Sequence, residues 1–132
     1  RAYDRNHEIS AAGKGVAIPG SSDPAFLGDR SRYNPEELLV ASLSACHMLW
    51  FLHLCSDAGI AVTSYSDTAT GVMTERADGA GEFTKVILRP RVAISDASRA
   101  ADTHALHAKA QELCFIARSV NFPVEHEPTV ES

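Results

Sequence analysis

The longest apolar stretch of the chain runs from Leu38 to Cys55, with only two serines and two histidines inside it. The residues before it are Asn34 and Pro35, which are preferred at the cap and the first position of a helix. Glu36 and Glu37 follow, and the helix dipole favours negative charge in that first turn. The pattern therefore predicts a long helix. No solvent-facing side can be drawn on it, so we expect it to be buried on all sides.

The segment before this helix has a weaker pattern. Residues 1–10 alternate around two apolar positions, and the sequence AAGKG then separates them from a short apolar run, VAI, so a β-hairpin is plausible here. Residues 19–35 concentrate Pro, Gly, Ser and Asp without a period, which indicates an ordered loop leading into the helix.

After the helix, Gly59 is a stop signal, and two strand-like runs follow. Residues 60–73 alternate as a half-exposed strand does, and residues 83–94 form a second run. The sequence TERADGAGE between them contains an Asp-Gly turn signal, so we expect the two runs to pair antiparallel.

The last part of the chain predicts a second helix and an edge strand. Apolar residues recur at intervals of three and four residues from Arg99 to about Ser119, after the sequence SDAS, which offers N-cap residues. In the sequence VNFPVEHEPTV, Pro123 and Pro128 cannot donate ladder hydrogen bonds, so at most a short edge strand is expected. The order of elements indicates an α+β fold, in one domain over residues 1–132. One sheet covers only one side of an apolar helix, so we expect a second subunit to cover the rest in a symmetric dimer.

Composition and charge exclude several classes of protein. The 132 residues carry a net charge of −5 and a pI near 5.6, and their 12 basic residues are scattered, so we expect no nucleic-acid and no anionic-membrane partner. Two histidines and two serines within the long apolar run favour a buried soluble helix over a membrane span. The chain begins without Met and shows no secretory pattern, and its three cysteines fit a reducing cytoplasm better than a disulfide framework.

Two cysteines are the candidates for chemistry. Cys46 lies in the middle of the first helix and Cys114 on the apolar stripe of the second. Free cysteines are most often small buried hydrophobes, whereas a reactive thiol needs a cation to hold its thiolate and a carboxylate to hold the cation. The cations available before the first helix are Arg1, Arg5, Arg30 and Arg32. Glu36 is about 15 Å from Cys46 along a straight helix, so an arginine or a partner chain would have to span the gap.

Two other cysteine chemistries were weighed. A zinc site at Cys46 and His47 is disfavoured, because adjacent helical residues point about 100° apart and no CxxC or HxxxH accompanies them. Protease chemistry would need a histidine and an orienting group near the thiol, and none of the six histidines is singled out. Cys55 ends the first helix and is expected in the core.

Two separated motifs carry a family resemblance. The sequence NPEELLVASLSACHMLWFLHLC resembles the central-helix motif of the OsmC/Ohr family, the osmotically induced and organic hydroperoxide resistance proteins, and ELCFIARSVNFPV resembles its second cysteine motif. The spacing of 68 residues between Cys46 and Cys114 matches as well. The resemblance implies an intertwined homodimer, with antiparallel sheets wrapped around long central helices and the sites at the interface.

The resemblance also implies residue roles. Cys46 matches the peroxidatic cysteine, Cys114 the resolving cysteine and Glu36 the family's glutamate, while Arg5 is the choice for its arginine. The sequence YDRNHE around Arg5 lacks the glycine-rich arginine loop of the Ohr branch, and Phe115 stands where that branch has proline. Both departures favour the wider OsmC-like branch.

The function implied is that of a thiol-dependent peroxidase. Cys46 would attack an organic hydroperoxide, or hydrogen peroxide, to form a sulfenic acid. Cys114 would close a disulfide that an external thiol reduces, with no metal or organic cofactor. The alternative is a non-catalytic dimeric stress-related protein that holds a small apolar ligand at its interface. The distance between the two sulfurs separates these hypotheses.

Overall fold

The computed structural model describes residues 3–132. The chain divides into two compact units, residues 1–39 and residues 40–132. The single domain expected over residues 1–132 stays a prediction.

The first unit contains the hairpin expected near the N-terminus. Strands β1 (His7–Ile9) and β2 (Ile18–Gly20) pair antiparallel, and a short 3-10 helix, η1 (Pro24–Phe26), follows them. Asp23 caps η1 by accepting a hydrogen bond from the Ala25 N–H. The hairpin is confirmed, and the loop before the long helix is ordered as expected.

The long helix α1 spans Pro35–Asp57. Asn34 accepts a hydrogen bond from the Glu37 N–H at 2.8 Å, while the Glu37 carboxylate accepts one from the Asn34 N–H at 3.0 Å. This reciprocal pair is a capping box, and it explains why the helix begins here. The predicted start is therefore confirmed, and the helix continues two residues beyond Cys55.

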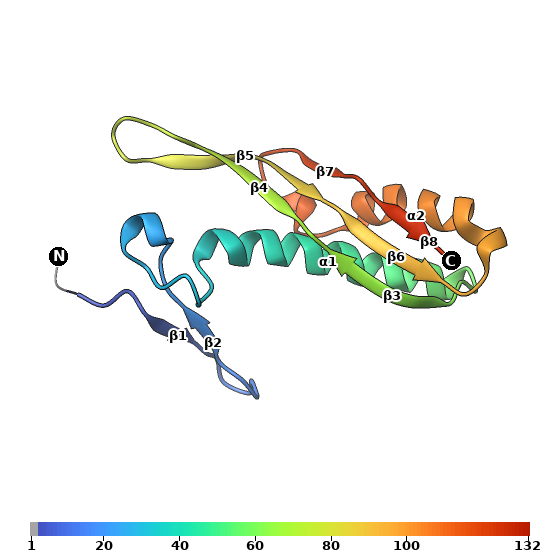
Figure 1. Ribbon diagram of the computed structural model, residues 1–132, viewed down its shortest axis with the longest axis horizontal. Helices are drawn as coiled ribbons and strands as arrows, with labels where there is room; N and C mark the ends of the chain where they lie inside the picture. Colours follow the sequence, from blue (N-terminus) through green and yellow to red (C-terminus); the bar gives the residue numbers. More distant parts are fainter. Residues whose placement is uncertain (1–2) are drawn as a thin grey trace. The chain divides into compact units, whose positions relative to one another are not determined.

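Strands of the second unit form two three-stranded sheets that follow one another along the same long hairpin (Figure 1). Strands β3 (Val62–Asp67) and β4 (Thr70–Glu75) pair antiparallel with β6 (Pro90–Ile94) and β5 (Gly81–Leu88), respectively. The tight turn between β4 and β5 contains Asp78 and Gly79, the latter at φ 90°. The hairpin predicted from the Asp-Gly signal is confirmed, and each of its two runs is divided into two strands.

Helix α2 (Ala100–Leu113) connects this hairpin to the last two strands. Strands β7 (Val124–His126) and β8 (Thr129–Glu131) pair parallel with β5 and β6 and form edges of their sheets. The α+β class is confirmed, with one helical crossover that makes the sheets mixed.

The predicted end of the second helix was wrong. Cys114 has φ −65° and ψ 114°, so it ends α2 in an extended conformation, and only a 3-10 turn, η3 (Ala117–Ser119), follows. The Cys114 carbonyl accepts a hydrogen bond from the Arg118 N–H, and its sulfur accepts one from the Ala117 N–H. The Ala117 N–H thus bonds to a side-chain sulfur and not to a backbone carbonyl, which interrupts the helical ladder that the periodicity predicted.

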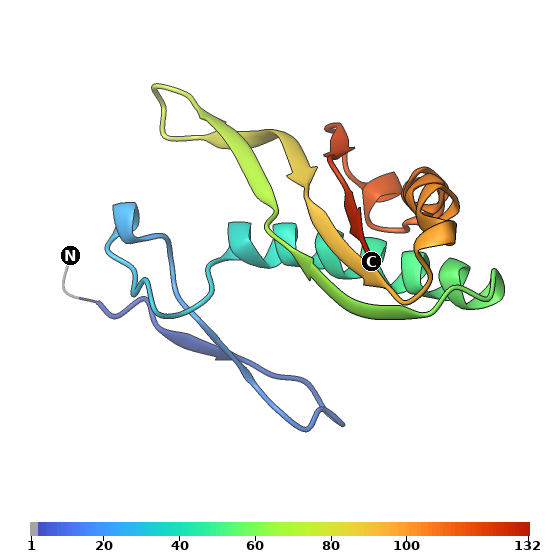
Figure 2. The ribbon, with the colours of Figure 1, turned by 45° about the vertical axis from the view of Figure 1, so that its right-hand side comes forward.

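Both helices of the second unit cover the same face of its strands (Figure 2). One core cluster joins Phe51 and Cys55 of α1, Val92 and Ile94 of β6, and Ala110 of α2. Along α1, positions 43, 47, 51 and 55 are buried, whereas positions 41, 45, 49 and 53 are exposed. One side of this apolar helix is thus left uncovered by its own unit.

Candidate functional site

The two cysteines singled out from the sequence lie together in the second unit. Cys46 lies in the middle of α1, and Cys114 follows the last residue of α2. Both are free thiols, and Cys46 lies close enough to Cys114 to raise the pKa of its thiol. Because these two helices run antiparallel, the end of α2 returns to the middle of α1. The two thiols that the hypotheses concern therefore lie near each other.

The surroundings of the two thiols differ. Cys114 is 1% exposed, whereas Cys46 is half-buried. Burial, and after it the interaction with the Cys46 side chain, raise the pKa of the Cys114 thiol to about 11, against a smaller lowering effect of the Ala117 N–H. Cys114 therefore stays protonated near neutral pH and can donate its S–H to the Cys46 sulfur.

Apolar side chains surround the cysteine pair. Leu49 and Trp50 follow Cys46 by three and four residues, so they lie on the same side of α1. The ring of Phe115, next to Cys114, packs edge-on against Trp50 with centroids 5.9 Å apart. Leu49 is 63% exposed and Phe115 is 68% exposed. An apolar molecule that reached Cys46 would find apolar surface to cover.

The third cysteine has a different environment. Cys55 lies two and a half turns from Cys46 along α1 and is 1% exposed within the core. Burial raises the pKa of its thiol to about 11. Cys55 packs in the core cluster, away from the Cys46–Cys114 pair, so the position fits the core role expected for it.

Arg5 and Glu36, the other two predicted site residues, lie in the first unit. The Arg5 guanidinium stacks 3.7 Å from the centroid of the Tyr3 ring and donates a hydrogen bond to the Tyr3 carbonyl. Glu36 is half-buried in the first turn of α1, where Glu37 forms the capping box. The association of Arg5 and Glu36 with the Cys46 thiolate stays a prediction.

Two other arginines considered as the cation for the Cys46 thiolate lie elsewhere in the first unit. Arg32 donates to the His7 carbonyl at 3.0 Å and forms an ion pair with Glu8 at 3.3 Å, while Arg30 is exposed. Arg1 lies outside the described residues.

A buried pair of histidines was missed from the sequence. His47 Nε2 and His107 Nδ1 lie 3.0 Å apart, and their rings are parallel within 3° with centroids 5.3 Å apart. His107 also stacks on Phe51 at 4.0 Å. Burial lowers the pKa of His47 to about 4 and that of His107 to about 3, so both rings are neutral at neutral pH. The apolar pattern around both positions indicates helices, but it cannot show that the two histidines meet.

A zinc site at Cys46 and His47 would need both side chains to face the same metal ion. His47 points into the core while Cys46 faces Cys114, as expected from the angle between adjacent helical residues. Among residues 3–132, no group of three His, Cys, Asp or Glu side chains is arranged to hold a metal ion.

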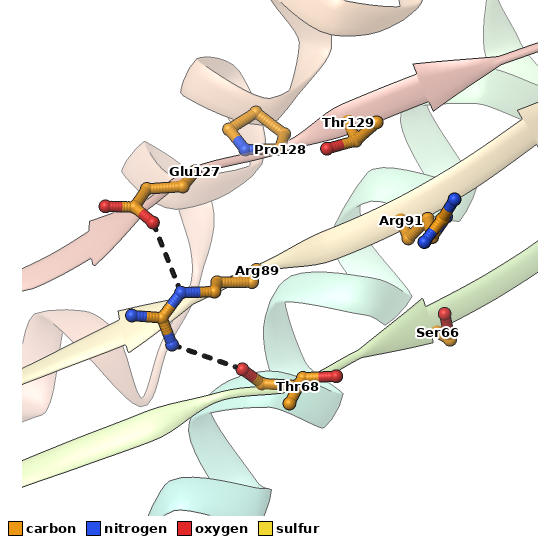
Figure 3. Close-up of a pocket in the computed structure, with 7 residues that line it drawn as sticks. All are labelled: Ser66, Thr68, Arg89, Arg91, Glu127, Pro128 and Thr129. Carbon is orange, nitrogen blue, oxygen red and sulfur yellow. Dashed lines mark hydrogen bonds and ion pairs between the residues drawn. The ribbon is translucent and has the colours of Figure 1, made fainter.

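A polar depression lies on the opposite face of the strands, with the helices behind it (Figure 3). Arg89 donates to the Glu127 carboxylate at 3.2 Å and to Thr70 Oγ1 at 2.6 Å. Arg91 donates to the Glu131 carboxylate at 2.5 Å. Both guanidinium groups are thus neutralised by neighbouring carboxylates, and the depression contains neither cysteine.

Comparison with known proteins identifies the family. The sequence model of the OsmC-like protein family matches residues 28–129. An OsmC-like protein of unknown function from Vibrio cholerae is 37% identical, with a TM-score of 0.86 over 96% of this chain and 85% of that one. No curated protein of similar sequence was found.

More distant structures share the fold. An organic hydroperoxide resistance protein from Elizabethkingia anophelis is 20% identical, with a TM-score of 0.70 over 97% of this chain and 89% of its own. An organic hydroperoxide resistance protein, OsmC, from Legionella pneumophila is 18% identical, with a TM-score of 0.64 over the full length of both chains. The family match and the similarity to the Vibrio protein show that this chain belongs to the OsmC/Ohr family of OsmC-like proteins.

Proposed function

We propose that this protein is a thiol-dependent peroxidase that reduces organic hydroperoxides. The observation that supports this most directly is the contact between two free thiols, one half-buried and one fully buried and protonated. Two structural cysteines would not need to meet, whereas a peroxidatic and a resolving cysteine must. Hydroperoxide resistance proteins also occur among the proteins that share this fold.

The chemistry divides into two steps. The Cys46 thiolate attacks one peroxide oxygen and breaks the O–O bond, which gives a Cys46 sulfenic acid and an alkoxide that takes up a proton as it leaves as an alcohol. The Cys114 thiol then attacks the Cys46 sulfur, and water leaves as the disulfide forms. An external dithiol reduces this disulfide and restores both thiols. Arg5 and Glu36 are the groups proposed to stabilise the Cys46 thiolate.

The apolar side chains near the site favour an organic substrate. A hydroperoxide with an alkyl or aryl tail can cover Trp50 and Phe115, whereas hydrogen peroxide cannot. Each buried methylene contributes about 0.8 kcal/mol. The proposed preference is therefore for hydroperoxides with a bulky apolar tail over hydrogen peroxide.

We also propose that the protein is a homodimer in the cytoplasm, where thiol reductants are available. The uncovered side of α1, which includes Ala41, Ala45 and Leu49, supports a second copy of the chain as its cover. The variant Leu49→Glu is expected to shift the protein to monomer in light scattering after gel filtration. The variant Ala101→Glu, at an exposed position of α2, serves as its control. A Leu49→Glu protein with an unchanged mass would contradict this interface.

Activity measurements on cysteine variants test the peroxidase proposal. Cys46→Ser is expected to abolish consumption of cumene hydroperoxide in the presence of a dithiol reductant. Cys114→Ser is expected to allow one oxidation of Cys46 and then to stall as the sulfenic acid, which mass spectrometry detects.

The third cysteine provides a matched control. Cys55→Ala removes a buried thiol from the same helix without touching the pair, so its activity is expected to match that of the parent. Full activity in Cys46→Ser would refute the proposal.

A further inference from the structure

Helices α1 and α2 contact each other at three places along the length of α2. The contacts, from one end of α2 to the other, are Arg99 Nη2 to the Ala58 carbonyl, His107 to His47 and Phe51, and Cys114 to Cys46. The first lies at the start of α2 and the last just beyond its end. The middle contact is therefore the polar connection nearest to the cysteine pair.

The histidine contact is buried and directional. His47 is 1% exposed and His107 is fully buried, and one neutral ring donates to the other across 3.0 Å. A neutral histidine has one donor and one acceptor nitrogen, so the bond fixes which edges of the two rings face each other. Apolar contacts between the helices would tolerate a small slide or rotation, but a buried hydrogen bond does not.

Helix geometry transmits this constraint to the cysteines. His47 is adjacent to Cys46 on α1, while Cys114 follows His107 by two turns, about 10 Å along α2. Fully buried Ala110 lies between His107 and Cys114, and its small side chain allows the helix to approach closely. A rotation of α2 about its own axis would therefore move the Cys114 sulfur away from Cys46.

We propose that the His47–His107 hydrogen bond is a positioning device, which holds Cys114 against Cys46 and so sets how readily the two sulfurs form a disulfide. Disulfide formation requires narrow geometry, with Cα atoms 4.4–6.8 Å apart in known disulfides. Attack of Cys46 on a peroxide does not involve Cys114. His47 and His107 are thus positioning residues for the closing of the disulfide, and this role deepens the peroxidase function proposed above.

The first test measures the thiol–disulfide equilibrium and needs no peroxide. Reduced protein is equilibrated with glutathione and glutathione disulfide, so that two glutathione molecules are released for each Cys46–Cys114 disulfide formed. His107→Leu removes the connection, and its effective thiol concentration is expected to fall about tenfold to a hundredfold. His107→Asn places an amide atom near the former Nδ1 position, and it is expected to recover most of the loss.

Stability separates positioning from a general loss of structure. Leucine is a better helix former than asparagine and fills more of the space against Phe51, so His107→Leu is expected to be the more stable of the two variants. Positioning predicts the opposite order for the effective thiol concentration. A thiol concentration that follows stability, or that is unchanged in both variants, would overturn the inference. If His107→Leu does not fold, the double variant His47→Leu/His107→Leu takes its place, because it leaves no histidine nitrogen of the pair without a partner. The same fall in effective thiol concentration is expected for it.

A kinetic test then addresses the catalytic consequence. With cumene hydroperoxide, His107→Leu is expected to form the sulfenic acid at the parent rate but to close the disulfide about tenfold to a hundredfold more slowly, so that sulfinic acid accumulates. Lys109→Gln, at an exposed position of α2, is the control. Equal slowing of both steps would overturn the inference. If the parent protein does not react with hydroperoxides, the proposed function fails, while the glutathione equilibrium still decides the positioning role.

Discussion

Acidification from pH 8 to pH 5 is expected to destabilise this protein through the two histidines buried between its helices. The pKa of His47 falls to about 4 and that of His107 to about 3, from an ordinary value of 6.5, mainly because burial penalises the charged rings. Neighbouring His126 lowers both values and His104 lowers that of His107, while Asp67 raises that of His47. Between pH 6.5 and the folded-state values, the unfolded chain binds more protons than the folded one.

The sign and size follow from proton linkage. The stability contributed by each neutral histidine is fully present well above pH 6.5 and is lost as the pH falls. At pH 5 the loss is about 2 kcal/mol for each ring, or about 4 kcal/mol for the pair, relative to pH 8. Both folded-state values lie below pH 5, so the loss down to that pH depends mainly on the unfolded-state value.

Urea unfolding of the reduced protein, followed by the fluorescence of Trp50, measures this loss between pH 8 and pH 5. His47→Leu/His107→Leu is expected to remove most of the pH dependence, whereas the control variant His7→Gln, at an exposed position, is expected to keep it. A parent protein that loses less than about 1 kcal/mol, or a double variant with the parent's slope, would refute the reasoning.

Three further predictions concern stability and are measured by urea unfolding at pH 8. Asp67 accepts hydrogen bonds from Ser44 Oγ at 2.6 Å and from the Arg89 N–H at 2.7 Å. Asp67→Ala is therefore expected to lower the free energy of unfolding by about 1–3 kcal/mol. Ser44→Ala removes one of the two bonds and should lower it less, so an equal loss in both variants would contradict this. Gly13 has φ 83°, whereas Gly15, in the same turn, does not have positive φ. Gly13→Ala is expected to lower the free energy of unfolding by about 1 kcal/mol, and Gly15→Ala is expected to leave it unchanged. Equal effects of the two variants would contradict the role of φ. Asn34→Ala should cost about 1 kcal/mol through loss of the capping box, and an unchanged stability would contradict that role.

Local signals explain which parts of the fold could be predicted. The start of α1 was predictable because the capping residues lie next to the segment they cap, and the β4–β5 turn because Asp-Gly favours it. The end of α2 was not, since the periodicity continues past Cys114, whereas the backbone of Cys114 is extended and the Ala117 N–H bonds to its sulfur.

The parts of the site that depend on contacts between distant segments could not be predicted from local patterns. The roles of Cys46 and Cys114 were inferred from the family motif, because no periodicity could show that the end of α2 returns to the middle of α1. The His47–His107 bond joins residues 60 positions apart and has no local signature. Arg5 was chosen by its spacing from Cys46, and its association with the thiolate stays a prediction.

The most direct test of the proposed function is the product of a single oxidation. Fully reduced protein is mixed with one equivalent of cumene hydroperoxide, quenched by alkylation, and digested for peptide mass spectrometry. The peroxidase mechanism predicts one cumyl alcohol released for each Cys46–Cys114 disulfide formed, with Cys55 recovered as a free thiol. Recovery of Cys46 and Cys114 as free thiols, with the hydroperoxide intact, would contradict it.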